Sequence, residues 1–159
     1  MNTRTNQNKA HAKVKIQPPV LVLIHIVLAF ALTRFLALPW VVPPTLQISG
    51  LLLVFLGFLF GIAALLVFRR AHTTLNPHGS VSRLVTSGIY RFTRNPIYLG
   101  FLLMLIGIPL NSGSYWGILL APIMVVLFNK LVIEHEEDYL AQKFGSDYES
   151  YKLNVRRWI

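Results

Sequence analysis

Acidic side chains are concentrated in one short segment of this 159-residue chain. Four of its six acidic residues lie between Glu134 and Asp138, directly after a long apolar run. Carboxylates at the polar end of an apolar helix can pair with arginines or bind a cation or an amine. A solvated acidic helix face is the simpler interpretation of the same pattern.

A second polar segment, residues 69–96, is rich in arginine and in turn-forming residues. Its arginines are Arg69, Arg70, Arg83, Arg91 and Arg94. Proline and glycine at residues 77–79, 88 and 96 indicate a shaped loop, and loops of this length are usually functional or disordered. Arginines can hold a carboxylate and the ring of Tyr90 can face a cation. A connector held to lipid headgroups by its arginines is the alternative interpretation.

Composition excludes several kinds of site. The chain has no cysteine, which excludes a disulfide framework, a thiolate metal site and a cysteine nucleophile. His72 and His78 lack the spacing of metal ligands, so we expect no metal. The formal charge is +9, but the eleven basic residues before Glu134 lie around and between apolar runs. We therefore expect membrane lipid as a partner and no nucleic acid.

Long apolar runs predict an all-α, multi-pass membrane protein with about four transmembrane helices, because about 20 apolar residues cross the hydrocarbon core. The interruption at residues 111–114 predicts that the last two helices form a hairpin. The expected spans cover about residues 20–40, 46–68, 97–110 and 115–133. We expect a basic tail over residues 1–18 and one membrane domain over residues 19–159.

The basic residues also predict the orientation of these helices. They cluster in the N-terminal tail and in residues 69–96, whereas the turns at residues 39–45 and 111–114 have none. By the positive-inside rule, both termini and the 69–96 loop are cytoplasmic. We expect an integral protein of a bacterial inner membrane, with its site formed by the cytoplasmic loop and the C-terminal helical tail.

Several short blocks in the polar segments resemble one family in their order and spacing. The blocks are Leu84–Arg91, Arg94–Gly100, Glu136–Leu140, Phe144–Tyr151 and Val155–Trp158. Together they resemble the isoprenylcysteine carboxyl methyltransferase and phospholipid methyltransferase superfamily over about residues 45–159. The resemblance implies an integral-membrane enzyme that uses S-adenosylmethionine without a Rossmann fold and methylates a lipid-soluble or amphiphilic acceptor.

The same resemblance implies which residues form the site. The cofactor-binding residues carried over from the family are Ser82, Arg83, Leu84, Val85, Tyr90, Asn95, Pro96, Ile97, Tyr98 and Glu136, with Glu137 as the neighbouring carboxylate. Two positions depart from the family pattern: Asn95 stands where the family has histidine, and Val132 stands where the prenylcysteine enzymes have a substrate-binding arginine. Arg156 or Arg157 could supply the missing cation, so these two and Glu136 are the predicted catalytic residues.

Two other functions stay open on the sequence. Membrane sterol and steroid reductases, which use a nicotinamide cofactor, have a similar hairpin and an ending similar to Lys143–Tyr148. A non-enzymatic membrane scaffold is the third interpretation. The pair of acids without a cysteine favours methyl transfer.

Overall fold

The computed structural model describes residues 16–71 and 82–159, and every regular element in these two stretches is a helix. The long helices are α1 (Pro18–Phe35), α2 (Pro44–Arg70), α3 (Pro96–Asn111), α4 (Trp116–Phe128), α5 (Glu134–Phe144) and α6 (Ser146–Asn154). A 3₁₀ helix, η2 (Gly88–Arg91), precedes α3, and a π-helix, η3 (Asn129–Ile133), joins α4 to α5. The predicted all-α class is confirmed. His72, His78 and most of the expected basic tail lie outside the described residues.

Prolines determine where several of these helices begin and end. Pro18, Pro44 and Pro96 occupy the first turns of α1, α2 and α3, where the missing N–H would have no helical partner. The first helix ends at Phe35, about five residues before the expected end of the first span. Pro39 follows shortly afterwards and disfavours the helical conformation in the residue before it.

Three helices in the described part of the chain are long and apolar enough to cross a membrane. They are α1, α2 and the continuous helix Trp116–Phe144, while α3 is a shorter apolar helix. The apolar part of the third ends at Ile133, since the acidic residues begin at Glu134. Exposed apolar side chains cover α1 and α2, among them Leu23, Phe55 and Ile62. Such surfaces are suited to lipid, and the chain is an integral membrane protein, although the number of crossings stays a prediction.

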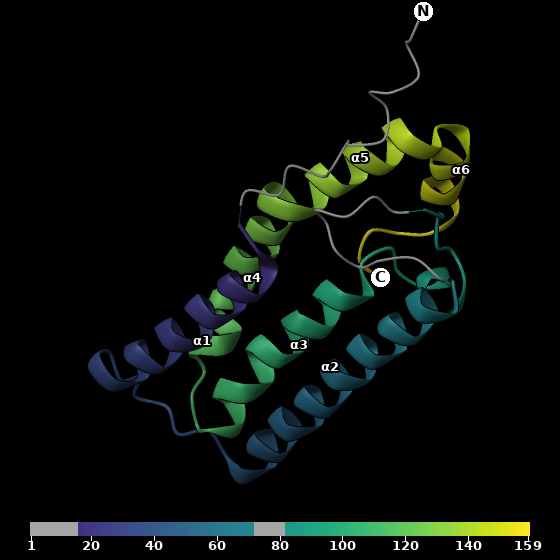
Figure 1. Ribbon diagram of the computed structural model, residues 1–159. Helices are drawn as coiled ribbons and strands as arrows, with labels where there is room; N and C mark the ends of the chain where they lie inside the picture. The colour runs from purple at the N-terminus through teal and green to yellow at the C-terminus, as the bar shows by residue number, and fades with distance from the viewer. Residues whose placement is uncertain (1–15, 72–81) are drawn as a thin grey trace, which may run out of the picture.

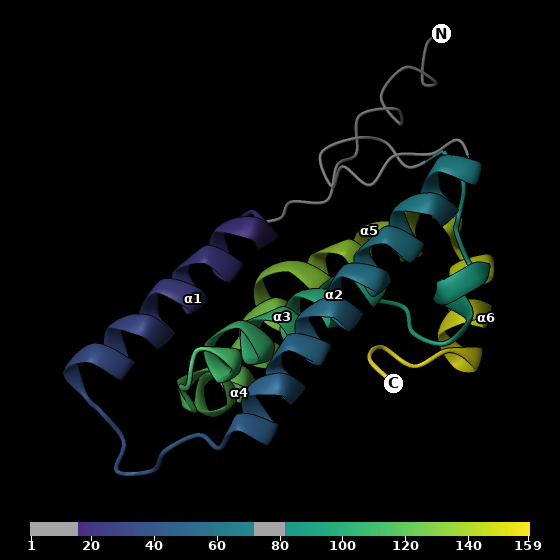
Figure 2. The same ribbon diagram turned by 90° about the horizontal axis from the view of Figure 1, so that it is seen from below.

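Helices α2 and α3 lie side by side along their length (Figures 1 and 2), and glycines allow their backbones to touch. A Cβ atom on Gly57 would lie 2.6 Å from the carbonyl oxygen of Gly100, and one on Gly100 would lie 2.7 Å from that of Gly57. Gly50 and Gly107 repeat this reciprocal contact seven residues away on each helix. Small residues at such positions permit the close packing that holds helices together in membranes.

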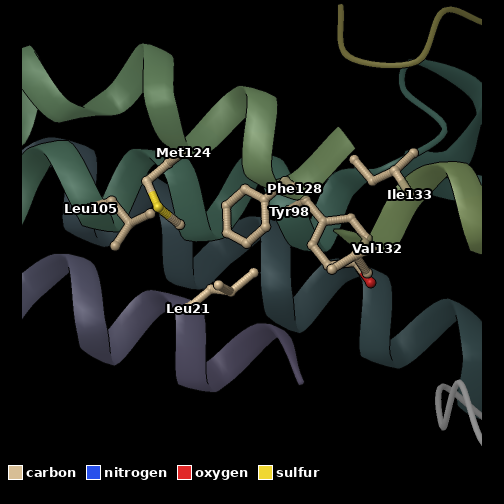
Figure 3. Packing of buried hydrophobic residues seen from close by; sticks show 7 residues of the cluster. All are labelled: Leu21, Tyr98, Leu105, Met124, Phe128, Val132 and Ile133. Atoms are coloured by element: carbon tan, nitrogen blue, oxygen red, sulfur yellow. The ribbon is translucent and has the colours of Figure 1, made fainter. Parts of the chain in front are cut away.

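The main apolar cluster lies where α1, α3, α4 and η3 meet (Figure 3). Its buried members are Leu21, Tyr98, Leu105, Met124, Phe128, Val132 and Ile133. The rings of Tyr98 and Phe128 lie 5.6 Å apart. Tyr98 is thus part of the core through its ring, while its hydroxyl group is available to the polar end of the bundle.

Buried His25 compensates for a proline inside α3. Pro109 has no N–H, so the carbonyl of Leu105, four residues earlier, lacks its usual helical donor. His25 is 2% exposed, and its ring hydrogen-bonds to the backbone of Leu105, while its Nε2 atom has no partner in the described structure. The histidine therefore ties α1 to α3 and has a structural role, as its position in an apolar helix suggests.

The glycine contacts predict unequal effects of two similar substitutions in α2. Gly57→Ala places a methyl group against the Gly100 backbone, whereas a Cβ on Gly61 meets nothing within 4 Å. We expect Gly57→Ala to be less stable than Gly61→Ala by about 1–3 kcal/mol, the usual cost of overpacking. Thermal unfolding of the two variants in the same detergent checks this difference, and equal stabilities would contradict the close α2–α3 contact.

Candidate functional site

Most of the residues that the sequence singled out gather at one end of the helix bundle. There α5, α6, η2 and the first turn of α3 come together with the end of the chain (Figure 1). Residues 155–159, which we call the C-terminal strap, run from α6 back toward the start of α3 (Figures 1 and 2). The hydrogen bonds that join α5, the loop before α3 and this strap connect segments that are distant in the sequence.

Glu136 and Tyr98 form a hydrogen-bonded pair at this end of the bundle. The hydroxyl group of Tyr98 donates to Oε1 of Glu136 over 2.7 Å. Burial raises the pKa of Glu136 to about 7, the hydrogen bond from Tyr98 acts in the opposite direction, and the charge of Glu137 adds to the rise. Among residues 16–71 and 82–159, no positive charge compensates this carboxylate, so it is suited to accept a cationic donor.

Glu137, the next residue, is in the opposite electrostatic situation. Arg157 donates to both of its carboxylate oxygens, through Nε over 3.1 Å and through an Nη atom over 2.6 Å. Arg94 adds a third contact at 3.3 Å, and its side chain and that of Glu137 are 11% and 13% exposed. Bidentate, charge-assisted pairing is the strong form of this interaction. The charge of Glu137 is therefore compensated by two arginines, whereas Glu136 has no cationic partner in the described part of the chain.

The C-terminal strap is bound to the loop that leads into α3. The backbone N–H of Arg94 donates to the carbonyl of Arg156 over 3.0 Å. The carbonyl of Arg157 accepts from the Asn95 amide over 2.9 Å and from the Thr93 hydroxyl over 3.3 Å. Asn95, which stands where the family has histidine, thus contacts the strap through its side chain.

Trp158 attaches the strap to the other side of the site. Its indole N–H donates to Oδ1 of Asn129 over 3.2 Å, at the first residue of η3. Its ring packs against the main apolar cluster. The strap therefore contacts the loop before α3, the start of η3 and, through Arg157, α5.

Tyr90 belongs to a second, smaller cluster beside Glu136. It packs with Ala64 and Val85, and its ring meets that of Phe68 edge-on at 5.5 Å between centroids. Its carbonyl accepts from the hydroxyl of Tyr151 over 2.7 Å. Burial raises the pKa of Tyr90, and the charge of Glu136 raises it further, so Tyr90 stays protonated at neutral pH.

The first residues of the predicted cofactor loop lie farther along the loop, against α6. Ser82, Arg83 and Leu84 line an open depression of about 510 Å³ together with Phe144 and Asp147. A second depression, of about 440 Å³, shares Thr86, Asp147 and Ser150 with the first and extends to Arg91. The loop thus contributes a polar surface at Ser82–Leu84 and buried residues at Val85 and Tyr90.

The remaining predicted residues differ in their surroundings. Pro96 is buried at the start of α3, and Ile97 packs against the cluster around Tyr90. Arg156 is exposed, and its guanidinium group lies 3.5 Å from the carbonyl of Ile159. Val132 is fully buried in the main apolar cluster. Among residues 16–71 and 82–159, no three His, Cys, Asp or Glu side chains are grouped as metal ligands would be.

Some contributors could not be identified from the sequence. Thr93 and Asn129 are ordinary polar residues whose importance depends on where the strap runs. Arg94 was considered only as a possible carboxylate ligand, yet its Nε and one Nη atom are buried without a hydrogen-bond partner in the described structure. Tyr148 of α6 is fully buried and interacts with Arg94. Only the block that resembles the family ending gave a signal for Tyr148.

Comparison with known proteins assigns the chain to a family. The phospholipid methyltransferase family model matches residues 45–147, which include α2, α3, α4, α5 and the loop before α3. The chain therefore belongs to the phospholipid methyltransferase family. The C-terminal strap lies after the matched segment.

Individual relatives agree with this assignment. The chain is 33% identical over 85 residues to a protein-S-isoprenylcysteine O-methyltransferase of Schizosaccharomyces pombe, covering 54% of this chain and 36% of the relative. It is 32% identical over 112 residues to protein-S-isoprenylcysteine O-methyltransferase A of Arabidopsis thaliana, covering 67% of this chain and 55% of the relative. An uncharacterized Haemophilus influenzae protein is 40% identical over 66 residues, 40% of this chain and 100% of that protein. No solved structure matches the chain.

The raised pKa of Glu136 predicts how a substitution affects stability. Folding lifts this pKa from 4.5 to about 7, so between these values the folded state binds more protons than the unfolded state. The free energy of unfolding therefore falls as the pH rises through this window. Glu136→Gln removes the buried charge and keeps an acceptor for Tyr98. We expect it to melt about 2–4 °C above the wild type at pH 8, corresponding to about 1 kcal/mol.

The comparison at acidic pH supplies the control for this prediction. The advantage of Glu136→Gln should shrink toward acidic pH and disappear below the unfolded-state pKa of 4.5, where the carboxyl group is protonated in both the folded and the unfolded chain. Thermal melting in detergent at pH 5 and pH 8 measures both values. An advantage that is equal at the two pH values would show that charge burial is not its cause.

Proposed function

We propose that this chain is a membrane-embedded methyltransferase that moves a methyl group from S-adenosylmethionine to a lipophilic acceptor, in the manner of an isoprenylcysteine carboxyl methyltransferase. The observation that carries the proposal is Glu136, a carboxylate held by Tyr98 without a neutralising cation, within the segment that the family model matches. The chain spans about a third of the Schizosaccharomyces pombe relative and just over half of the Arabidopsis thaliana relative.

The residues present fit the charged groups of S-adenosylmethionine. Its amino group is a cation, and Glu136 is a carboxylate with unused hydrogen-bonding capacity. Its carboxylate needs N–H donors, and two buried guanidinium nitrogens of Arg94, beside Glu137, have no hydrogen-bond partner in the described part of the chain. Arg83, which is exposed along the adjoining depression, is the alternative carboxylate ligand. A matched pair of opposite charges of this kind favours a zwitterion.

Two aromatic side chains complete the proposed site. The cofactor supplies an electrophilic methyl group on a sulfonium ion. The ring of Tyr98 is fixed in the core by Phe128, so it positions the hydroxyl group at Glu136. The ring of Tyr90 is fixed by Phe68, and we assign to it the contact with the cation or the adenine ring. Ser82–Val85, Asn95, Pro96 and Ile97 extend the proposed cofactor site along the loop. The contribution of these residues is to bind and orient, which can supply much of the rate of a displacement reaction.

The proposed acceptor reaches the site from the lipid. Large apolar side chains are exposed along α1 and α2, so an amphiphile can approach along these helices while the cofactor approaches from water. We place both termini on the cytoplasmic side of a bacterial inner membrane, on the distribution of basic residues. The reductase alternative is less favoured, because the family and the named relatives are methyltransferases.

Binding of S-adenosylhomocysteine tests the proposed role of Glu136. A charge-assisted hydrogen bond contributes about 1.5–3 kcal/mol, so Glu136→Gln should weaken binding by about 10- to 100-fold. Wild-type affinity should fall below about pH 7, where Glu136 becomes protonated, and the variant should lose this pH dependence. Calorimetry on detergent-purified protein measures both effects.

The control for this experiment lies on the same helix. Glu134 forms an exposed ion pair with Lys130, so Glu134→Gln should leave the affinity unchanged. Wild-type affinity in Glu136→Gln would place the amino-group ligand elsewhere. Binding of a nicotinamide dinucleotide in place of S-adenosylhomocysteine would favour the reductase alternative.

Substitution of Arg156 tests whether this residue binds a carboxylate of the acceptor. Val132 is buried and uncharged, and Arg157 is paired with Glu137, so Arg156 is the tail arginine left to meet an acceptor carboxylate. Because an exposed ion pair contributes about 0.5–1 kcal/mol, Arg156→Ala should raise the KM for a prenylcysteine analogue about 2- to 5-fold, and Arg156→Lys should not. A methyl-transfer assay measures this, and an unchanged KM would remove Arg156 from the acceptor site.

A further inference from the structure

Two consecutive residues of α5 are held by two different parts of the chain. Glu136 is bound by Tyr98 of α3, and Glu137 is bound by Arg157 of the C-terminal strap. Side chains of consecutive helical residues project about 100° apart. The two contacts therefore hold the same helical turn from two directions and fix the rotation of α5 about its axis.

The position of this turn makes such a constraint necessary. It follows directly after η3, the π-helix at Asn129–Ile133. A π-helical turn contains more residues than an α-helical turn, so it changes the angular register of everything after it relative to α4. The direction in which Glu136 points is therefore not set by α4 alone and depends on contacts that α5 makes with other segments.

Arg157 is placed to supply that constraint. Its carbonyl accepts from Thr93 and Asn95 in the loop that leads into α3, and its guanidinium group binds Glu137 on α5. One residue thus connects the segment that carries Tyr98 with the helix that carries Glu136. The neighbouring contact of Trp158 with Asn129 fixes the strap independently at η3.

We infer that Arg157 is a positioning residue of the proposed cofactor site, which holds Glu137 against the loop before α3 and thereby keeps Glu136 within reach of Tyr98 and of the cofactor's amino group. This inference rests on the proposed function. In this role Arg157 acts through Glu137 and does not itself contact the cofactor. The residue lies beyond the segment matched by the family model, residues 45–147.

A double-mutant cycle on S-adenosylhomocysteine binding tests the inference. Removing groups that orient a ligand-binding residue typically costs about 10- to 100-fold in affinity at metal sites, and we expect a loss of about tenfold for Arg157→Ala. Arg157→Lys should fall between this variant and the wild type, because lysine cannot form the bidentate pair. Arg157 and Glu137 act as one unit. The double variant Arg157→Ala/Glu137→Gln should therefore lose no more affinity than whichever single variant binds more weakly.

The control removes a different cation from the C-terminal region. Lys152 pairs with Glu149 at the surface of α6, where both side chains are exposed. Lys152→Ala changes the net charge by the same amount as Arg157→Ala and should leave affinity unchanged. Thermal melting of every variant in the same detergent separates lost affinity from lost folding. If Arg157→Ala does not fold, the affinities of Arg157→Lys and Glu137→Gln for S-adenosylhomocysteine test the same inference.

The pH dependence of binding distinguishes positioning from a general loss of structure. The titratable groups that face Glu136 are Tyr98 of α3, Tyr90 of η2 and Glu137, with Arg94 and Arg157 bound to the last. Without Arg157, the charge of Glu137 is less compensated and disfavours ionisation of Glu136. The binding midpoint, the pH at which half of the binding affinity is lost, should therefore move to a higher value. Glu137→Gln removes that charge and should move the midpoint to lower pH. A general structural loss would weaken binding without these opposite shifts.

Three results would overturn the inference. Wild-type affinity in Arg157→Ala, together with weak binding by Glu136→Gln, overturns the role of Arg157 and leaves the proposed function standing. Fully additive losses in the double variant would show that Arg157 does not act through Glu137. Absence of S-adenosylhomocysteine binding in the wild type would overturn the proposed function itself, and this inference with it.

Discussion

The contact between the backbones of α2 and α3 is the constraint on which the site depends. Gly57 and Gly100 each lie against the carbonyl oxygen of the other, so neither helix can slide or rotate without a clash. The N-terminal end of α3 carries Tyr98, and the C-terminal end of α2 carries Phe68, which supports Tyr90. Because the two helices are locked, both tyrosines keep a defined position at the same end of the bundle. The apolar core is thus what gives a small polar site its geometry.

Adjacent carboxylates in α5 are in different electrostatic surroundings because their neighbours differ. Glu137 has two arginine partners and serves as a structural anchor, whereas burial and the nearby Glu137 raise the pKa of Glu136. A buried carboxyl group with a raised pKa is a recurring property of functional sites. Arg157 accounts for much of this difference, because its bidentate pairing compensates the charge of only one of the two acids.

The sequence predicted the elements better than the contacts. Apolar runs and the prolines at residues 18, 44 and 96 indicated the helices, and the acidic segment indicated where Glu136 would be. The π-helix at η3 could not be predicted, since its residues have no composition that distinguishes them from an α-helix. The pairing of Arg157 with Glu137 depends on the path of the strap, which periodicity does not describe. The roles assigned to the individual site residues stay predictions.

The segment that matches the family model and the C-terminal strap that follows it are therefore coupled through the charge of Glu137. Glu136 and Glu137 lie inside the segment that matches the phospholipid methyltransferase family, while Arg157 lies after it. Without Arg157, only Arg94 would remain to compensate Glu137, and a partly buried carboxylate with too little compensation disfavours the folded state. A negative charge on Glu137 would also disfavour ionisation of Glu136, the form that accepts a cation. The strap thus supports the fold and the proposed binding chemistry by the same interaction.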